Sequence, residues 1–89
     1  MEPAVFDAIA SPRRREILRL VWNTEQTAGA IHRAMPDVTF GAVSLQLRSL
    51  VEAGLVEAEK RGIWTHYRLR PDLPSGVRSL VDALLTGLL

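Results

Sequence analysis

The sequence predicts a mainly α-helical domain that carries one two-stranded β-hairpin. Over most of the 89-residue chain, apolar residues recur three or four positions apart, which is the spacing of one helix face. Residues 55–70 instead alternate with the two-residue period of strands around a central glycine. About five helices, with the hairpin after the fourth, are typical of a winged helix-turn-helix, in which a helix and a hairpin wing share one surface.

The first helix is expected at residues 4–10, and the second begins at Pro12. Ser11 is a favoured N-cap because its hydroxyl accepts a hydrogen bond from a free backbone N–H, and proline suits the first helical turn. The apolar stripe of this second helix comprises Ile17, Leu18, Val21 and Trp22.

A short third helix and a longer fourth helix follow, separated by a turn at residues 36–38. Thr27 and Thr39 are the expected N-caps, and Gly54 is expected to end the fourth helix. Residues 39–53 therefore form the candidate recognition helix. The apolar faces comprise Ala30, Ile31, Ala34 and Met35 in the third helix, and Val43, Leu47, Leu50 and Gly54 in the fourth, with Val51 at its edge.

The wing is expected at residues 55–70, with its first strand at residues 55–59 and its turn at Arg61-Gly62. Trp64 and Tyr67 fall on opposite faces of the return strand, so we expect at most one of them to pack on the helices.

The last helix is expected at residues 75–89, after two prolines that end the hairpin. Its apolar stripe is wide for the last element of a small domain, so we expect it to pack on something beyond its own core. A second subunit is the simplest candidate. The stripe comprises Val77, Leu80, Val81, Leu84, Leu85 and Leu88.

The length predicts a single domain, residues 1–89, with a core so small that a second subunit would help to stabilise it. The absence of cysteine excludes disulfides and thiolate metal sites. No apolar run is long enough to span a membrane, and the acidic N-terminus lacks the pattern of an export signal. We therefore expect a cytoplasmic protein that makes no membrane contact.

Eleven Lys and Arg residues against ten Asp and Glu give a net charge of +1, so the distribution of charge has to indicate the partner. Lys60 and Arg61 are expected at the wing tip, where they would reach DNA phosphates or a minor groove. The alternative is an ordinary solvated turn.

A second basic cluster, residues 13–15, lies at a helix N-terminus, where the helix dipole disfavours positive charge. Phosphate contacts would account for it, and so would salt bridges to Glu16, Asp7 or a partner subunit. We favour the salt bridges, because the dipole costs only tenths of a kcal/mol at a surface.

The fourth helix turns a second set of residues outward, away from its apolar face. Gly41 and Ser44 are small enough for the backbone to approach base edges, and Arg48 suits a phosphate or a guanine edge. Leu45 is either a contact for a thymine methyl group or an ordinary exposed leucine. The outward set comprises Gly41, Ser44, Leu45, Arg48 and Glu52.

Catalytic and metal chemistry are poorly represented. His32 and His66 are the only histidines, they fall on different elements, and neither has a carboxylate at ligand spacing. The serines lack a paired base, and no glycine-rich phosphate loop is present. We expect no enzymatic activity, no cofactor and no metal site.

Three segments resemble the ArsR/SmtB family of bacterial and archaeal transcriptional repressors: AIASPRRREILRLV, TAGAIHRAM and AVSLQLRSLVEAGLVEAEKRGIWTHYRL. The similarity extends from Val5 to Leu69. Its most specific parts are the SPRRREIL opening of the second helix, the V-S-x-x-L-x-x-L-x-x-A-G-L-V pattern from Val43 to Val56 and the R-G-x-W-x-x-Y-x-L wing from Arg61 to Leu69.

The resemblance implies a homodimer formed through the first and last helices, with the fourth helix in the major groove of double-stranded DNA at an imperfect palindrome. The implied DNA-binding residues are Thr39, Phe40, Gly41, Ser44, Leu45, Gln46, Arg48, Lys60 and Arg61. The implied interface residues are Val5, Phe6, Ile9, Val77, Leu80, Val81, Leu84, Leu85 and Leu88.

Metal-sensing members of that family carry a cysteine-containing motif in the third helix, or acidic and histidine ligands in the last one. This chain has His32 in the former and Asp82 in the latter. The sequence therefore predicts a sequence-specific repressor that does not sense metal in that way and whose effector is unknown. Two alternatives stay open: a winged-helix module for protein contact, indicated by the near-zero net charge, and a repressor gated by a small apolar ligand at the dimer interface, indicated by the leucine-rich last helix.

Overall fold

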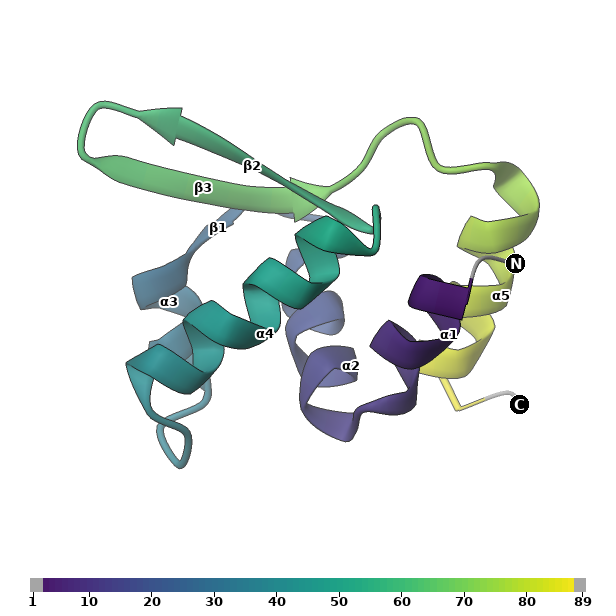
Figure 1. Ribbon diagram of the computed structural model, residues 1–89, viewed down its shortest axis with the longest axis horizontal. Coiled ribbons are helices and arrows are strands. Elements are labelled where there is room, and N and C mark those ends of the chain that lie inside the picture. The colour runs from purple at the N-terminus through teal and green to yellow at the C-terminus, as the bar shows by residue number, and fades with distance from the viewer. Residues whose placement is uncertain (1–2, 88–89) are drawn as a thin grey trace.

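The computed structural model describes residues 3–87, which form five α-helices and a three-stranded antiparallel sheet (Figure 1). The predicted mainly α winged helix-turn-helix is confirmed, with α3 and α4 as the helix pair and β2 and β3 as the wing. The elements are α1 (Pro3–Ala10), α2 (Pro12–Val21), β1 (Gln26–Thr27), α3 (Ala28–Ala34), α4 (Phe40–Glu52), β2 (Val56–Arg61), β3 (Trp64–Leu69) and α5 (Ser75–Leu85).

The three predicted N-caps are confirmed. Each side-chain hydroxyl accepts a hydrogen bond from a backbone N–H three residues further on, and such a cap stabilises a helix by about 1 kcal/mol. The distances are 3.2 Å from Ser11 to Arg14, 3.2 Å from Thr27 to Ala30 and 3.1 Å from Thr39 to Ala42.

The other end of α4 stops at Gly54, as predicted. Gly54 has a φ of +80°, a conformation that side chains disfavour, and its amide donates to the Val51 carbonyl at 3.0 Å. The next amide, that of Leu55, donates to the Leu50 carbonyl at 3.1 Å, which completes a Schellman motif. Both leucines are buried, so this motif directs the chain from α4 straight into the wing.

The prediction for the wing turn was wrong by one residue. β2 continues to Arg61, which lies opposite Trp64, and the turn is Gly62-Ile63. Gly62 has a φ of +62°, which the first central position of a type II′ turn requires. Lys60 and Arg61 therefore belong to the strand, and Ile63, 85% exposed, occupies the tip.

The predicted two-stranded hairpin is present, and β1, which was not predicted, adds a third strand to it in the order β1-β3-β2. Gln26 lies opposite Tyr67, and Thr27 lies opposite His66. Two residues are too short to show an alternating pattern, and Thr27 also serves as the N-cap of α3. The strand thus attaches the start of α3 to the wing.

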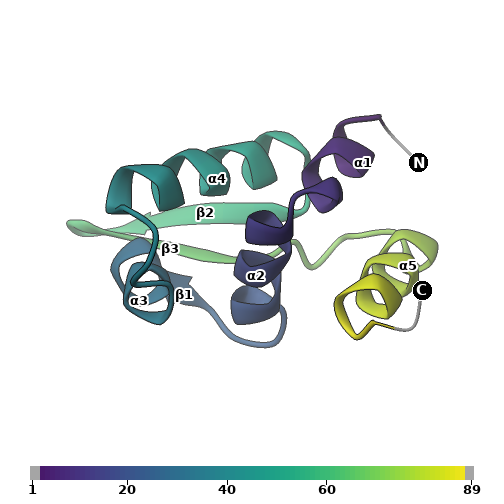
Figure 2. The same ribbon diagram turned by 90° about the horizontal axis from the view of Figure 1, so that it is seen from below.

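The core lies between the sheet and the helices, and α5 packs against α2 at the end of the molecule remote from the wing tip (Figure 2). Arg19 of α2 donates to the Leu85 carbonyl at 2.9 Å, and Val81 and Leu85 are buried. We expected the whole apolar stripe of α5 to pack against something outside the core of its own chain. For these two residues that expectation is wrong, because they are part of the core. Within residues 3–87, no helix is long and apolar enough to cross a membrane.

The last helix also ends earlier than the expected residue 89. The amide of Thr86 donates to the Asp82 carbonyl at 3.0 Å, and that of Gly87 donates to the Leu84 carbonyl at 3.2 Å, which closes the helix after Leu85. The predicted interface residue Leu88 lies outside the described residues.

Candidate nucleic-acid interface

The helix α4 is anchored by one face and open on the other, as its periodicity predicts. Val43, Leu47 and Leu50 are each 0% exposed. The residues that were predicted to point outward are accessible to solvent. Gly41, Leu45, Arg48 and Glu52 are exposed, and Ser44 is half-buried.

Two apolar side chains stand out on the open part of α4. Phe40 is 51% exposed and Leu45 is 59% exposed. The ring of Phe40 meets that of His32 edge-on, with the ring centres 5.8 Å apart, so it is oriented by α3. Exposed apolar groups on a recognition helix suit contact with thymine methyl groups.

A surface groove separates α4 from the wing, which projects past α3 and the N-terminal half of α4 (Figure 1). Phe40 and Ser44 line it from α4, and Ile63 and Thr65 line it from the wing. Tertiary structure thus brings two predicted contact residues of the helix beside the hairpin.

The two predicted wing cations point to opposite faces of the hairpin. Lys60 lies opposite Thr65, which lines the groove and shares its strand face with Tyr67, a second groove residue. Arg61 lies opposite Trp64 on the other strand face, and Trp64 borders the groove only beside the turn. Directly opposed residues share a face of the sheet, and neighbours along a strand do not. Lys60 is therefore on the groove side, and among residues 3–87 its ammonium forms no ion pair.

Arg61 belongs to a group of charged side chains on the other face, which we call the outer-face cluster. The Arg61 guanidinium pairs with Glu25 and, at 2.5 Å, with Glu59. Its hydrogen bond lowers the pKa of the Glu25 carboxyl, and the two carboxylates raise the pKa of Arg61. The cluster comprises Glu25, Glu57, Glu59, Arg61, His66 and Arg68.

The outer-face cluster was not predicted, although part of it had a signal in the sequence. Glu57, Glu59 and Arg61 alternate along β2, and His66 and Arg68 alternate along β3, so each set shares one face. The cross-strand bond from Arg68 to Glu57, 2.6 Å long, follows from that pattern once the register is known. The position of Glu25, outside the hairpin, has no local signal.

The arginines at residues 13–15 behave in two ways. Arg13 forms the expected salt bridge to Glu16, at 3.3 Å, and a second one to Asp37 in the turn before α4, at 2.5 Å. The hydrogen bond from Arg13 lowers the pKa of the Asp37 carboxyl.

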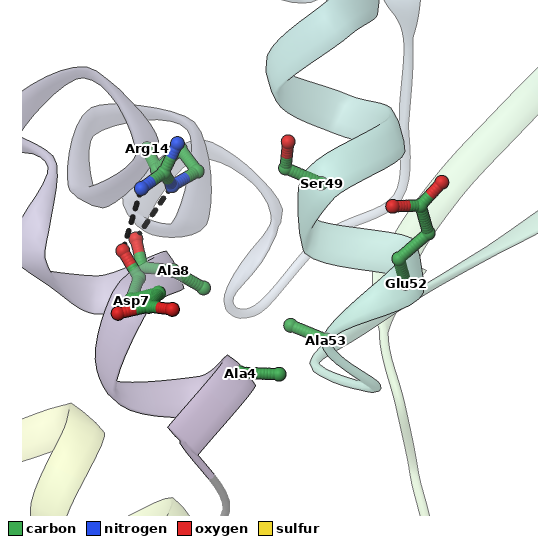
Figure 3. Close-up of a pocket in the computed structure, with 7 residues that line it drawn as sticks. All are labelled: Ala4, Asp7, Ala8, Arg14, Ser49, Glu52 and Ala53. Atoms are coloured by element: carbon green, nitrogen blue, oxygen red, sulfur yellow. Dashed lines mark hydrogen bonds between the residues drawn. The ribbon is translucent and has the colours of Figure 1, made fainter.

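Among residues 3–87, Arg14 and Arg15 do not form the expected salt bridges to Glu16 or Asp7, and both donate instead to backbone carbonyls at the end of α1. Arg14 bonds the carbonyls of Asp7 and Ala8 (Figure 3), and Arg15 bonds those of Ile9 and Ala10. The last carbonyls of a helix lack partners within it and carry its negative dipole end, so nearby guanidinium groups are stabilised there.

The proposed dimer residues fall into two groups. Val5, Ile9, Val81 and Leu85 are at most 8% exposed within the single chain, so they support α1 and α5 from inside. Phe6 is 54% exposed and Leu80 is 37% exposed, and Val77 and Leu84 are half-buried.

The two histidines lie on different elements and have different neighbours. His32 lies on α3 against Phe40, and the Nδ1 of His66, on β3, lies 3.2 Å from Glu25. Across residues 3–87, no three His, Cys, Asp or Glu side chains are grouped so that they could hold a metal ion.

Comparison with known proteins matches residues 9–59 to a family described as a helix-turn-helix domain. The arsenic resistance transcriptional regulator ArsR1 of Pseudomonas putida is 28% identical over 85 residues, which is 96% of this chain. The chain spans 63% of the length of that curated relative.

Solved structures agree with this match. One is a homodimeric winged helix-turn-helix DNA-binding domain from Mycobacterium bovis, described as a possible ArsR-family transcriptional regulator. It has a TM-score of 0.78 and 29% identity, covering 96% of this chain and 75% of that one. Another is HlyU from Vibrio cholerae, with a TM-score of 0.76 and 25% identity, covering 91% of this chain and 84% of that one.

Proposed function

We propose that this chain, which belongs to the helix-turn-helix domain family and has the winged fold of the ArsR/SmtB type, is a dimeric DNA-binding transcriptional repressor. The observation that carries the proposal is α4, whose apolar face is buried while its other face lies open beside the wing groove. A helix presented in this way fits a major groove, and the wing then reaches the neighbouring backbone.

In this proposal, the open face of α4 reads base edges and the wing contacts phosphates. Arg48 supplies a guanine or phosphate contact, Leu45 a contact for a thymine methyl group, and Lys60 a phosphate contact from the groove side of the wing. The proposed DNA-binding set remains Thr39, Phe40, Gly41, Ser44, Leu45, Gln46, Arg48, Lys60 and Arg61.

We propose that α1 and α5 form the dimer interface through the apolar side chains that the single chain leaves open, chiefly Phe6 and Leu80. A two-fold dimer then presents two α4 helices to two half-sites of an imperfect palindrome. The proposal involves no metal, because the chain lacks cysteine and its two histidines lie on α3 and β3. It involves no enzymatic step. It places the protein in the cytoplasm with its DNA.

A footprint on the DNA upstream of the gene tests the proposal. We expect protection of two half-sites about one helical turn apart, with an affinity that falls steeply as salt rises because phosphate contacts release counterions. Absent protection, or binding that does not respond to salt, would overturn it.

The outer-face cluster favours a second candidate, a winged-helix module for protein contact. Arg61 and Arg68 are each paired with a carboxylate, which reduces the positive charge that the wing offers to phosphates. A tight protein partner together with no DNA protection would support this candidate over the repressor.

A further inference from the structure

Arg14 joins the end of α1 to the middle of the recognition helix. Its Nε donates to the Ala8 carbonyl at 2.8 Å and its Nη2 donates to the Asp7 carbonyl at 2.5 Å. Its third nitrogen, Nη1, donates to Oε1 of Gln46 on α4 at 3.0 Å. Figure 3 shows the guanidinium beside the carbonyls of α1, across a pocket from Ser49 of α4.

This contact determines how the Gln46 amide is oriented. A guanidinium group has only donors, so the group that it meets on Gln46 has to be the carbonyl oxygen. The amide nitrogen then faces away from Arg14, and among residues 3–87 it donates no hydrogen bond within the chain. Both Arg14 and Gln46 are half-buried, which limits competition from water for the bond between them.

An oriented glutamine reads bases differently from a free one. A free glutamine recognises adenine with two bonds, in which its carbonyl accepts from N6 and its amide donates to N7. The bond from Arg14 takes one of the two lone pairs of the carbonyl oxygen and fixes the direction of that oxygen toward α1, so the amide donor is the group directed away from α1. A donor alone suits the guanine edge, where both N7 and O6 are acceptors.

We propose that Arg14 is a specificity-determining positioning residue, which holds Gln46 as a hydrogen-bond donor so that the dimer prefers guanine over adenine at one base pair of each half-site. The inference rests on the proposed DNA-binding function and adds to it a residue outside the helix-turn-helix surface.

The chain offers a matched control in Arg15. Its guanidinium also bonds the end of α1, donating to the carbonyls of Ile9 at 2.8 Å and Ala10 at 3.1 Å. Among the described residues it makes no bond to α4. An effect that comes merely from loosening α1 would therefore appear in Arg15→Met as well as in Arg14→Met.

The experiment is a selection of binding sites from a randomised duplex pool by the full-length wild type and its variants, with dimer mass and circular dichroism measured for each. We expect a guanine preference at one position in the wild type, which Gln46→Ala abolishes. Arg14→Met should shift the guanine-to-adenine ratio there about fivefold or more toward adenine, because the carbonyl is released. Arg15→Met should select the wild-type site, and Arg14→Met combined with Gln46→Ala should behave like Gln46→Ala alone.

Gln46→Glu gives a second test, which keeps the bond to Arg14 because a carboxylate also accepts a hydrogen bond from the guanidinium. This change replaces the donor with an acceptor, so we expect the preferred base to change from guanine to cytosine, whose N4 donates.

Unchanged preferences in Arg14→Met or Gln46→Glu would overturn the inference, and so would an equal shift in Arg15→Met. A wild type that selects no sequence would instead overturn the proposed function.

Discussion

Arg61, the last residue of β2, forms an ion pair with Glu25, which precedes β1 and is distant from the wing in sequence. The pair means that the wing arginine already has a carboxylate partner before any DNA phosphate approaches. Binding a phosphate there requires the phosphate to compete with Glu25 and Glu59, whereas Lys60 on the groove side has no such competitor among residues 3–87.

We predict that Glu25→Gln strengthens DNA binding, because it removes one of the two carboxylates that compete with a phosphate for Arg61. The affinity should rise a few-fold, and the slope of log affinity against log salt should steepen by up to about 0.9 for one added phosphate contact. Fluorescence anisotropy titrations at several salt concentrations measure both. Asp72→Asn is the control, because it makes the same charge change at a carboxylate paired with Arg70, which follows β3 at the end of the wing remote from its tip. Equal or weaker binding by Glu25→Gln would contradict the prediction.

We predict that Lys60→Gln weakens binding to all duplexes alike and lowers the salt slope by about one, which is the signature of a lost phosphate contact. The same titrations on specific and scrambled duplexes check this. Arg70→Gln is the matched loss of charge, at a residue bonded to Asp72 at 2.7 Å, and should change little. A change in sequence preference, rather than in overall affinity, would show that Lys60 reads bases.

The Arg13–Asp37 pair predicts a dependence of stability on pH. Because Arg13 lowers the pKa of Asp37 in the folded protein, the pair stabilises the fold fully above the ordinary Asp value of 3.8. That stabilisation is lost as the pH falls through the lowered pKa. Urea unfolding from pH 7 to pH 2 should therefore find Asp37→Asn less stable than wild type at neutral pH, with the difference disappearing in acid. Glu52→Gln is the control, and a gap that widens in acid would refute the assignment.

We predict that the double variant Phe6→Glu with Leu80→Glu is a folded monomer that no longer binds its operator. Both side chains are substantially exposed in the single chain, so charging them should disrupt the interface without opening the core. Sedimentation velocity with circular dichroism measures assembly and folding together. Ile63→Glu, at the exposed wing tip, is the control and should remain dimeric. A wild type that is monomeric at micromolar concentration would rule out the dimer.

The starts of α2, α3 and α4 and the end of α4 were predictable because the hydrogen bonds that determine them are local. Ser11, Thr27 and Thr39 each cap a helix through an N–H only three residues away. Gly54 ends α4 through hydrogen bonds that span at most five residues. The buried face of α4 follows from helical periodicity alone. The sequence therefore determined the fold class, the buried face of α4 and the presence of the wing.

Only the tertiary structure decided which groups far apart in the chain meet. Arg14 forms a hydrogen bond with Gln46, which is 32 residues away in the sequence, and Arg61 forms one with Glu25, which is 36 residues away. Neither contact produces a periodic signal in the sequence. The same holds for α5, whose stripe looks uniform in sequence, yet Val81 and Leu85 are buried against the chain's own core while Leu80 remains exposed. Periodicity determines which residues share a face, but which neighbour covers that face depends on how the elements pack.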